Sequence, residues 1–313
     1  MRIHLGTPAV SDRPMALTIG NFDGVHLGHQ AMLHALLLAA KSLGLATGVV
    51  TFEPHPREFF SPREAPPRLT TLREKLELLD AAGIDQVTVL RFNRTLAAMP
   101  AEAFVTEWLV NRLRTRWLLV GDDFRFGAQR TGDFETLQRV GAARGFECFA
   151  LSSVMAAGLR VSSSAVRDAL AAGRMDLARQ LLGRPFFISG RVSTGQQLGR
   201  TLGYPTANIR LNRRVAPLSG IFAVSVSGLG ASSWTGVASL GTRPTVSDSG
   251  EWLLEVHLFD FDRSIYGARI HVHFLHKIRD ETRFDSLETM TRQIAHDTAT
   301  ARDYFAQATD PST

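Results

Sequence analysis

Short apolar runs alternate with helix-like patterns through the first half of the chain. Apolar runs of strand length occur at 16–20, 47–52, 86–92, 117–121 and 146–151. Helical spacing is found between them at 28–43, 72–82, 101–113 and 134–144, and two short helices are predicted at 162–172 and 175–182. Strand–helix alternation predicts an α/β domain with a Rossmann-like, doubly wound parallel sheet, which binds ligands at the carboxyl ends of its strands.

The pattern changes to β after Gly183-Arg184-Pro185. Strands are predicted at 186–192, 206–209, 221–227, 233–240, 252–261 and 269–274, separated by turn residues. A closing helix is predicted at 287–305. We therefore expect two domains, residues 1–183 and residues 184–308, the second a small antiparallel β-barrel with a C-terminal helix.

Composition excludes several classes of protein. The chain has 313 residues, 44% of them hydrophobic and 21% charged, which is typical of a soluble globular protein of about two domains. No apolar run reaches the roughly 20 residues of a membrane span, and we expect no export signal. Cys148 is the only cysteine, so no intrachain disulfide can form, and we expect a cytoplasmic protein. The net charge of +5 is spread along the chain, which does not indicate a nucleic-acid partner.

The most specific motif is GNFDGVHLGH at residues 20–29, where the first strand meets the first helix. Gly20, Gly24 and Gly28 allow close approach of a ligand, and a helix N-terminus favours phosphate. His26 and His29 are suited to hydrogen-bond the α-phosphate of ATP as charge builds on it. The motif is not a P-loop, because the Gly-Lys-Ser/Thr element is absent.

Three further segments follow strand ends or open a helix, so they converge on the same crevice. TFEPHP contributes His55, GDDFRFG contributes Asp122 and Asp123, and SSSAVR contributes three serines and Arg167. The serines can cap a helix and contact phosphate, and Arg167 can neutralise charge one turn later. Taken alone, the serines also fit a simple helix cap, and His55, Asp122 and Asp123 also fit solvated loops.

Together these segments resemble the first domain of the bacterial bifunctional riboflavin kinase/FAD synthetase family. The resemblance implies ATP contacts from Gly20, Phe22, His26 and His29, with Asp123 and Arg167 lining the site. Ser164 stands where the family usually has Thr, and the hydroxyl is retained. The expected ATP-binding set in this domain is Gly20, Asn21, Phe22, Asp23, Gly24, Gly28, His55, Asp123, Ser162, Ser163 and Ser164, and the expected catalytic set is His26, His29 and Arg167.

A second glycine-rich cluster opens the β half. Glycines recur every four residues at 195, 199 and 203, in a loop that can fold over phosphates. Thr206 and Asn208 alternate on the next strand and offer neutral oxygens suited to Mg²⁺. The run Gly-Tyr-Pro-Thr-Ala-Asn at 203–208 resembles the riboflavin kinase signature. The expected phosphate-binding residues are Gly195, Gly199, Arg200, Gly203, Pro205, Thr206 and Asn208.

A later strand carries the candidate base. Alternation along 253–261 turns Glu255 away from the core, where it fits either a general base or an exposed carboxylate. The resemblance implies that Glu255 activates the 5′-hydroxyl of riboflavin. Ser239 replaces the usual Asn of the family. Arg279, Glu281 and Phe284 are expected to border the flavin. His271, His273 and His276 have no evident further ligand, which favours a structural or surface role over a metal site.

We therefore expect a bifunctional enzyme that uses ATP and Mg²⁺ to phosphorylate riboflavin to FMN and then adenylylates FMN to FAD, releasing pyrophosphate. Its partners are expected to be riboflavin, FMN and ATP, without nucleic acid or membrane. Two alternatives remain open. One is a nucleotidyltransferase of other specificity, and the other is an RNA-binding protein suggested by the basic excess.

Overall fold

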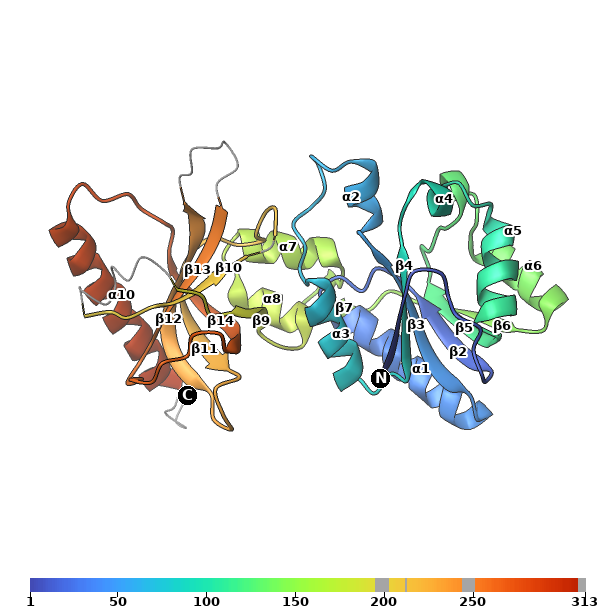
Figure 1. The fold of residues 1–313 in the computed structure, drawn as a ribbon, viewed down its shortest axis with the longest axis horizontal. Coiled ribbons are helices and arrows are strands. Elements are labelled where there is room, and N and C mark those ends of the chain that lie inside the picture. The colour runs from blue at the N-terminus through green and yellow to red at the C-terminus, as the bar shows by residue number, and fades with distance from the viewer. Residues whose placement is uncertain (195–202, 212, 244–250, 309–313) are drawn as a thin grey trace. The chain divides into compact units, whose positions relative to one another are not determined.

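The computed structural model describes residues 1–194, 203–211, 213–243 and 251–308, and divides into two compact units (Figure 1). Unit 1 contains Met1–Pro66 and Thr70–Ser163, and unit 2 contains Pro67–Leu69 and Ser164–Thr313. The chain thus leaves unit 1 for three residues before returning to it. The predicted boundary at 183/184 lies after the two helices with which unit 2 begins, and it remains a prediction.

Unit 1 is built on a six-stranded parallel sheet in the order β1-β4-β3-β2-β5-β6. Its strands are β1 (Arg2–Leu5), β2 (Met15–Ile19), β3 (Ala46–Glu53), β4 (Gln86–Arg91), β5 (Thr115–Gly121) and β6 (Glu147–Leu151). The connecting helices are α1 (Leu27–Leu43), α2 (Pro56–Phe60), α3 (Leu72–Ala81), α4 (Arg94–Ala97), α5 (Ala101–Ala103), the π-helix η1 (Phe104–Arg112) and α6 (Phe134–Arg144). The chain order reverses between β2 and β5, which places the ligand crevice of such a sheet at the carboxyl ends of these two strands.

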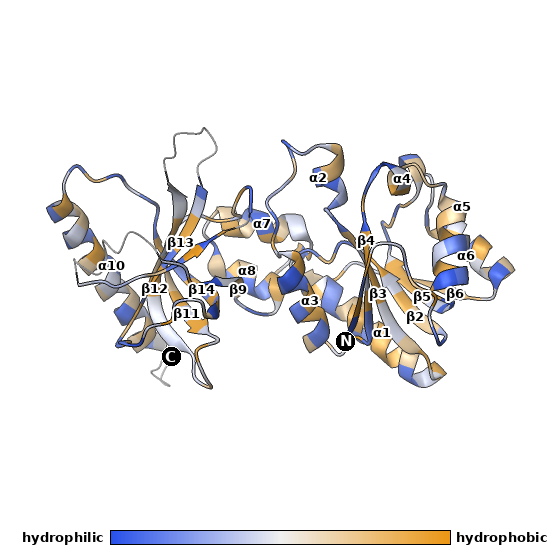
Figure 2. Ribbon diagram, viewed as in Figure 1, coloured by the Kyte–Doolittle hydropathy of each residue, from blue (hydrophilic) through white to orange (hydrophobic). Residues whose placement is uncertain are grey.

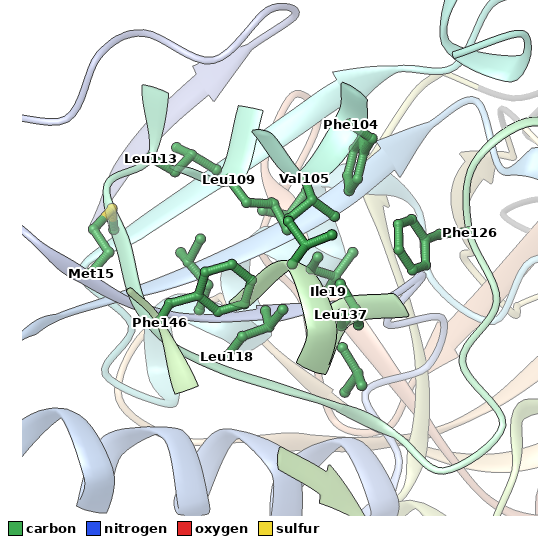
Figure 3. Close-up of a cluster of buried hydrophobic side chains, with 14 of the residues drawn as sticks. Met15, Ile19, Phe104, Val105, Leu109, Leu113, Leu118, Phe126, Leu137 and Phe146 are labelled. Atoms are coloured by element: carbon green, nitrogen blue, oxygen red, sulfur yellow. The ribbon is translucent and has the colours of Figure 1, made fainter. Parts of the chain in front are cut away.

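Each face of this sheet has its own apolar core. Ala16, Val49 and Leu119 face α1 and α3. Met15, Ile19 and Leu118 face η1 and α6, and Figure 3 shows these three in one cluster with Leu109 and Leu137. Alternate residues of one strand therefore enter opposite cores, as expected of a sheet covered on both sides. Apolar residues predominate on the strands in Figure 2, whereas α3 and α6 carry both apolar and polar stretches.

Unit 2 contains an antiparallel six-stranded sheet in the order β10-β13-β12-β11-β14-β9. Its strands are β9 (Phe186–Arg191), β10 (Ala207–Arg210), β11 (Gly220–Ser227), β12 (Trp234–Arg243), β13 (Glu251–Leu258) and β14 (Arg269–Arg279). A bridge between Ser193 and Asn208 brings the two ends of the order together, so the sheet is nearly closed. The interior is filled by side chains such as Phe222 and Phe274, whose rings meet edge to face at 5.2 Å. The predicted antiparallel barrel is confirmed.

In the described part of unit 2, three helices accompany the barrel strands. α7 (Ser163–Ala171) and α8 (Met175–Leu182) precede β9, and α8 packs against β9 and β14. α10 (Leu287–Ala308) packs on β11, β12 and β14, where Ala301 is buried beside Ile221 and Phe259. A small hairpin of β7 (Met155–Ala156) and β8 (Leu159–Arg160) closes unit 1. The predicted helix at 287–305 is therefore present, three residues longer at its C-terminal end.

Candidate active sites

The turn after β2 is fixed from a distant part of the chain. The buried Asp23 carboxylate accepts hydrogen bonds from Thr70, at 2.9 Å from its backbone N and 3.2 Å from its hydroxyl. The same hydroxyl accepts the Gly24 N–H at 3.0 Å. Phe22 and Val25 adopt left-handed backbone angles, with φ of 49° and 41°. Such angles strain a side-chain-bearing residue, so the Thr70 contacts hold a conformation that the turn would not keep unaided.

The two motif histidines form a stacked pair at the start of α1. The Nδ1 atom of His26 caps the helix by accepting the His29 N–H at 3.4 Å. Their rings are 3.7 Å apart at an interplanar angle of 18°, and the Phe22 ring lies 5.0 Å from that of His29. A Cβ on Gly28 would lie only 3.2 Å from the His26 ring, so a glycine at this position leaves room for the ring. The pair therefore stands at the positive end of the helix dipole.

A cavity of about 580 Å³ adjoins the same turn. Six phenylalanines contribute to its wall, with aliphatic, Arg and Asp side chains among them. The lining includes Gly20, Asn21, Phe52, His55, Arg57, Phe60, Phe92, Phe104, Asp123, Phe124, Arg125, Phe126 and Arg130. Phe52, Phe60 and Phe92 make edge contacts with one another or with Phe59 at 5.2–5.9 Å. Sequence reasoning missed this aromatic wall, because its members lie on separate elements.

Two predicted residues line this cavity but also have structural contacts. His55 caps α2, since its Nδ1 accepts the Arg57 N–H at 3.1 Å. Asp123 forms an exposed ion pair with Arg160 at 3.0 Å. Its neighbour Asp122 accepts hydrogen bonds from the backbone N and hydroxyl of Ser153. The cavity therefore combines His55 and Asp123 with the backbone of the motif turn.

The SSSAVR stretch is divided between the units. In unit 1, the Ser163 hydroxyl donates to the Asp23 carbonyl oxygen at 2.9 Å, so this serine contacts the motif turn, and Ser162 precedes it. In unit 2, Ser164 is exposed, and Arg167 Nε donates to the Pro67 carbonyl oxygen at 2.6 Å.

In unit 2, the candidate base and metal residues are cross-strand neighbours. Glu255 of β13 is half-buried and lies opposite Asn208 of β10 and Ser239 of β12. Asn208 is 5% exposed, its amide donates to the Thr206 carbonyl oxygen at 3.2 Å, and its Oδ1 has no hydrogen-bond partner among the described residues. Pro205 contacts β13, because its carbonyl oxygen lies 2.9 Å from Nδ1 of His257 on that strand. The expected residues Gly195, Gly199 and Arg200 lie outside the described residues, and Gly203 precedes this segment with a positive φ of 83°.

The segment after β14 approaches the same strands. The Ser239 hydroxyl donates to Glu281 Oε1 at 3.5 Å, and a Cβ on Gly241 would collide with the Glu281 carboxylate. Residues 239 and 241 share a face of β12, so Glu281 lies over the face that carries Glu255. Burial raises the pKa of the Glu281 carboxyl, and the Glu255 charge adds to the rise. Phe284 lies under the Arg279 guanidinium, 5.7 Å from ring centroid to Cζ.

The three histidines of β14 are engaged with aromatic and hydroxyl groups. The His271 and His273 rings lie 5.4 and 5.5 Å from Phe187, and His273 Nε2 is 3.2 Å from the Ser227 hydroxyl. Burial, with the charges of His271 and Arg184, lowers the pKa of His273. His276 stacks on Tyr304 at 5.2 Å. These contacts describe packing on the outer face of the barrel strands.

Comparison with known proteins identifies the family. A model described as FAD synthetase matches residues 9–165, and one described as riboflavin kinase matches residues 182–305. The bifunctional riboflavin kinase/FMN adenylyltransferase of Escherichia coli (strain K12) is 48% identical over 308 residues, covering 97% of this chain and 98% of the relative. The protein of that name from Pseudomonas fluorescens is 50% identical over 290 residues, covering 93% of each. The chain belongs to the bifunctional riboflavin kinase/FMN adenylyltransferase family.

Membership in the riboflavin kinase/FMN adenylyltransferase family confirms the predicted activities, with ATP, riboflavin and FMN as substrates and FAD as a product. Neither the other nucleotidyltransferase specificity nor the RNA-binding alternative is supported. A solved structure named as a macrolide-efflux protein from Streptococcus pneumoniae has a similar fold, with a TM-score of 0.81 and 27% identity over 96% of this chain and 99% of that one. In the described part of this chain, every helix is too short or too polar to cross a membrane.

Proposed function

We propose that the two reactions are divided between the units, with adenylyl transfer in unit 1 and riboflavin phosphorylation in unit 2. The observation that carries this division is the position of the two candidate sites. The stacked histidines stand at a helix N-terminus in unit 1. In unit 2, Asn208 is the cross-strand neighbour of Glu255, and its Oδ1 has no hydrogen-bond partner among the described residues. The separate family matches to the two halves support the same division.

In unit 1, an FMN phosphate oxygen attacks the α-phosphorus of ATP and the bond to pyrophosphate breaks. The attacking phosphate is ionised at neutral pH, so the site needs hydrogen-bond donors more than a base. We assign this task to His26, His29 and the N–H groups at the start of α1. Because Nδ1 of His26 caps the helix, its phosphate contact would use Nε2. Ser162, Ser163 and Asp123 remain proposed ATP contacts in unit 1, whereas we assign Asp23 to holding the turn. The roles expected of Ser164 and Arg167, which belong to unit 2, stay predictions.

The aromatic cavity is the proposed site of the isoalloxazine ring of FMN. A flat aromatic ring system is suited to stacking on phenylalanine side chains, and a cavity of about 580 Å³ is within the usual range for such ligands. Arg57, Arg125 and Arg130 line the wall and can complement the phosphate charge. Gly20 and Asn21 belong to both the cavity and the motif turn, so an FMN in the cavity would lie next to the nucleotide.

This assignment is tested with Phe60, which is 64% exposed and can be removed without emptying a core. Phe60→Ala should weaken FMN binding by roughly two- to tenfold, which is the value of one aromatic contact. Flavin fluorescence titration measures the binding, with Phe149→Ala as the control, because Phe149 is also exposed in unit 1 but lies outside the cavity. Equal FMN affinities for the two variants would show that the flavin does not bind in this cavity.

In unit 2, we propose that Glu255 accepts the proton of the riboflavin 5′-hydroxyl. The hydroxyl oxygen attacks the γ-phosphorus of ATP, and ADP leaves. A carboxylate held on a strand is well placed for this role because its position is fixed. Arg279 ends β14, Glu281 and Phe284 follow it, and these three residues are the proposed flavin contacts. Gly203 and Pro205, together with Gly195, Gly199 and Arg200, are proposed to bind the phosphates.

A divalent cation fits the residues present in unit 2. A buried amide oxygen without a partner costs free energy, and a hard cation such as Mg²⁺ would satisfy it. Asn208 and Thr206 are therefore the proposed ligands, and the ion would neutralise charge on the ATP phosphates. We also propose that both reactions occur in the cytoplasm, with which a chain containing a single cysteine is compatible.

The division of labour is tested by incubating the protein with ATP and Mg²⁺ and following the flavins by chromatography. The native protein should convert riboflavin to FMN and then to FAD. Glu255→Gln should lose riboflavin phosphorylation, by a factor of roughly 10²–10⁴, and still convert added FMN to FAD. His29→Ala should lose the conversion of FMN to FAD and still phosphorylate riboflavin. Loss of both activities in either variant would contradict two independent sites.

A further inference from the structure

A lysine is buried beneath the motif turn of unit 1. Lys75 lies in the first turn of α3 and is 5% exposed. The helix is already capped by the Thr71 hydroxyl and the Glu74 carboxylate, so its start does not require a lysine. Burial of an ammonium group is costly unless it donates hydrogen bonds, so the hydrogen bonds of this ammonium are expected to matter.

The contacts of Lys75 lead to the turn through one intermediate. Its Nζ donates to the hydroxyl of Thr51 at 3.3 Å, and Thr51, which is fully buried on β3, donates to the carbonyl oxygen of Asn21 at 3.3 Å. An ammonium can only donate, so Thr51 must accept from Lys75 and direct its own proton at Asn21. Lys75 therefore sets the direction of the Thr51 hydroxyl.

The Asn21 carbonyl belongs to the peptide that joins Asn21 to Phe22. Phe22 has the left-handed φ of 49°, is fully buried, and packs its ring against His29. Rotation of this peptide would move the Phe22 ring and the histidine that rests on it. Asn21 itself lines the aromatic cavity, and its buried Oδ1 has no hydrogen-bond partner among the described residues. One carbonyl thus connects the helix-start histidines with the cavity wall.

We propose that Lys75, acting through Thr51, is a positioning residue for adenylyl transfer to FMN. Its ammonium holds the Asn21–Phe22 peptide in the orientation that places His29 and the Asn21 side chain for catalysis. Lys75 lies outside the glycine–histidine motif, and its role rests on the adenylyl-transfer site proposed for unit 1. A displacement of about 1 Å in a catalytic group can cost roughly a hundredfold in rate, so loss of this support should reduce kcat.

The test compares Lys75→Met and Thr51→Val, which remove the two donors, with Thr51→Ser, which keeps the hydroxyl. Lys41→Met is the matched control, because Lys41 is exposed in the last turn of α1. FMN adenylylation is measured as kcat and as KM for ATP and FMN. Riboflavin phosphorylation, measured in the same preparation, reports whether the chain is folded and whether the established activity of the other site persists.

Lys75→Met and Thr51→Val should each lower the kcat of adenylylation at least tenfold, with less than threefold change in either KM. Because both act through one contact, the kcat of the double variant should be no lower than that of the more impaired single variant. Thr51→Ser and Lys41→Met should stay within threefold of the native kcat, and phosphorylation should be unchanged in all. A native-like kcat in Lys75→Met would overturn the proposal, as would multiplicative losses in the double variant. If Lys75→Met does not fold, equal kcat values for Thr51→Val and Thr51→Ser would overturn it instead.

Discussion

Asp297 of α10 makes a buried polar contact between the C-terminal helix and the barrel. It is 3% exposed and accepts three hydrogen bonds from Arg279, two from Nε at 2.9 and 3.1 Å and one from Nη2 at 2.7 Å. Gln293, one turn earlier on α10, donates to the same carboxylate at 2.9 Å. Asp297→Asn keeps the shape of the side chain and removes its charge, which leaves the Arg279 guanidinium without its counter-ion.

The size of the effect follows from this burial. Removing one partner of a buried ion pair costs roughly 3–5 kcal/mol, and the lower end applies here because the Arg279 side chain is 21% exposed. For a unit of this length, about 3 kcal/mol lowers the midpoint of thermal unfolding by roughly 6–12 °C. Arg279 also donates to the Asp280 carbonyl oxygen at 2.9 Å and lies over Phe284. Asp297→Asn should therefore also raise the KM for riboflavin.

The chain offers a matched control in the pair of Asp260 and Arg302. This pair also joins α10 to the barrel through two hydrogen bonds, at 3.0 and 3.1 Å, but its side chains are 77% and 49% exposed. Exposed ion pairs contribute little, so Asp260→Asn should unfold at nearly the native temperature. Aliquots heated to successive temperatures are assayed for both activities. Equal midpoints for the two variants, or a parallel loss of FMN adenylylation in Asp297→Asn, would refute the reasoning.

Two further predictions come from shifted pKa values. Burial and the Glu255 charge raise the pKa of Glu281, so the native state binds its proton more tightly than the unfolded chain, and stability falls as pH rises from the unfolded to the native pKa. Glu281→Gln should remove that loss, so its midpoint of thermal unfolding should fall less than that of the native protein over this pH range, and an equal fall in both proteins would contradict this. Burial also raises the pKa of the Cys148 thiol to about 12 from 9.0. Iodoacetamide should therefore label the native protein roughly a thousandfold more slowly than the unfolded chain, and similar rates would show that the thiol is not shielded.

The sequence predicted the elements whose side chains follow one period. The strands β2 to β6 and the helices α1, α3 and α6 lie within two residues of their expected bounds. Strands β2 to β5 are mostly buried and the three helices each bury one face, whereas the edge strand β6 is mostly exposed and was found from its apolar residues alone. The segment 101–113 was predicted as one helix, but only Ala101–Ala103 is α-helical, and Phe104–Arg112 forms a π-helix. The two helix types differ by one residue in hydrogen-bond spacing, which apolar periodicity over so short a segment does not resolve.

Short elements were missed for a different reason. The edge strand β1 is four residues long and mostly exposed, so it leaves almost no apolar pattern. Helix α2 shows little periodicity in five residues, but it had a usable signal, since Pro56 occupies the first position and His55 and Glu58 form a capping box. This signal would have placed Phe60, which lines the aromatic cavity, and its neighbour Phe59 on one short helix after the second predicted strand.

The candidate site of unit 1 shows the limit of motif reasoning most directly. The motif supplied the histidines, but the groups that fix its conformation come from residues 51 and 70–75. Thr70 binds Asp23 across 47 residues, and Lys75 reaches Thr51 across 24. No periodicity links positions so far apart, and a Thr and a Lys near a helix start normally indicate capping and solvation. An intact GNFDGVHLGH motif therefore specifies which groups contact the nucleotide without ensuring that they are held in place. For this reason a substitution at Thr70 or Lys75 should impair FMN adenylylation while every residue of the motif is retained.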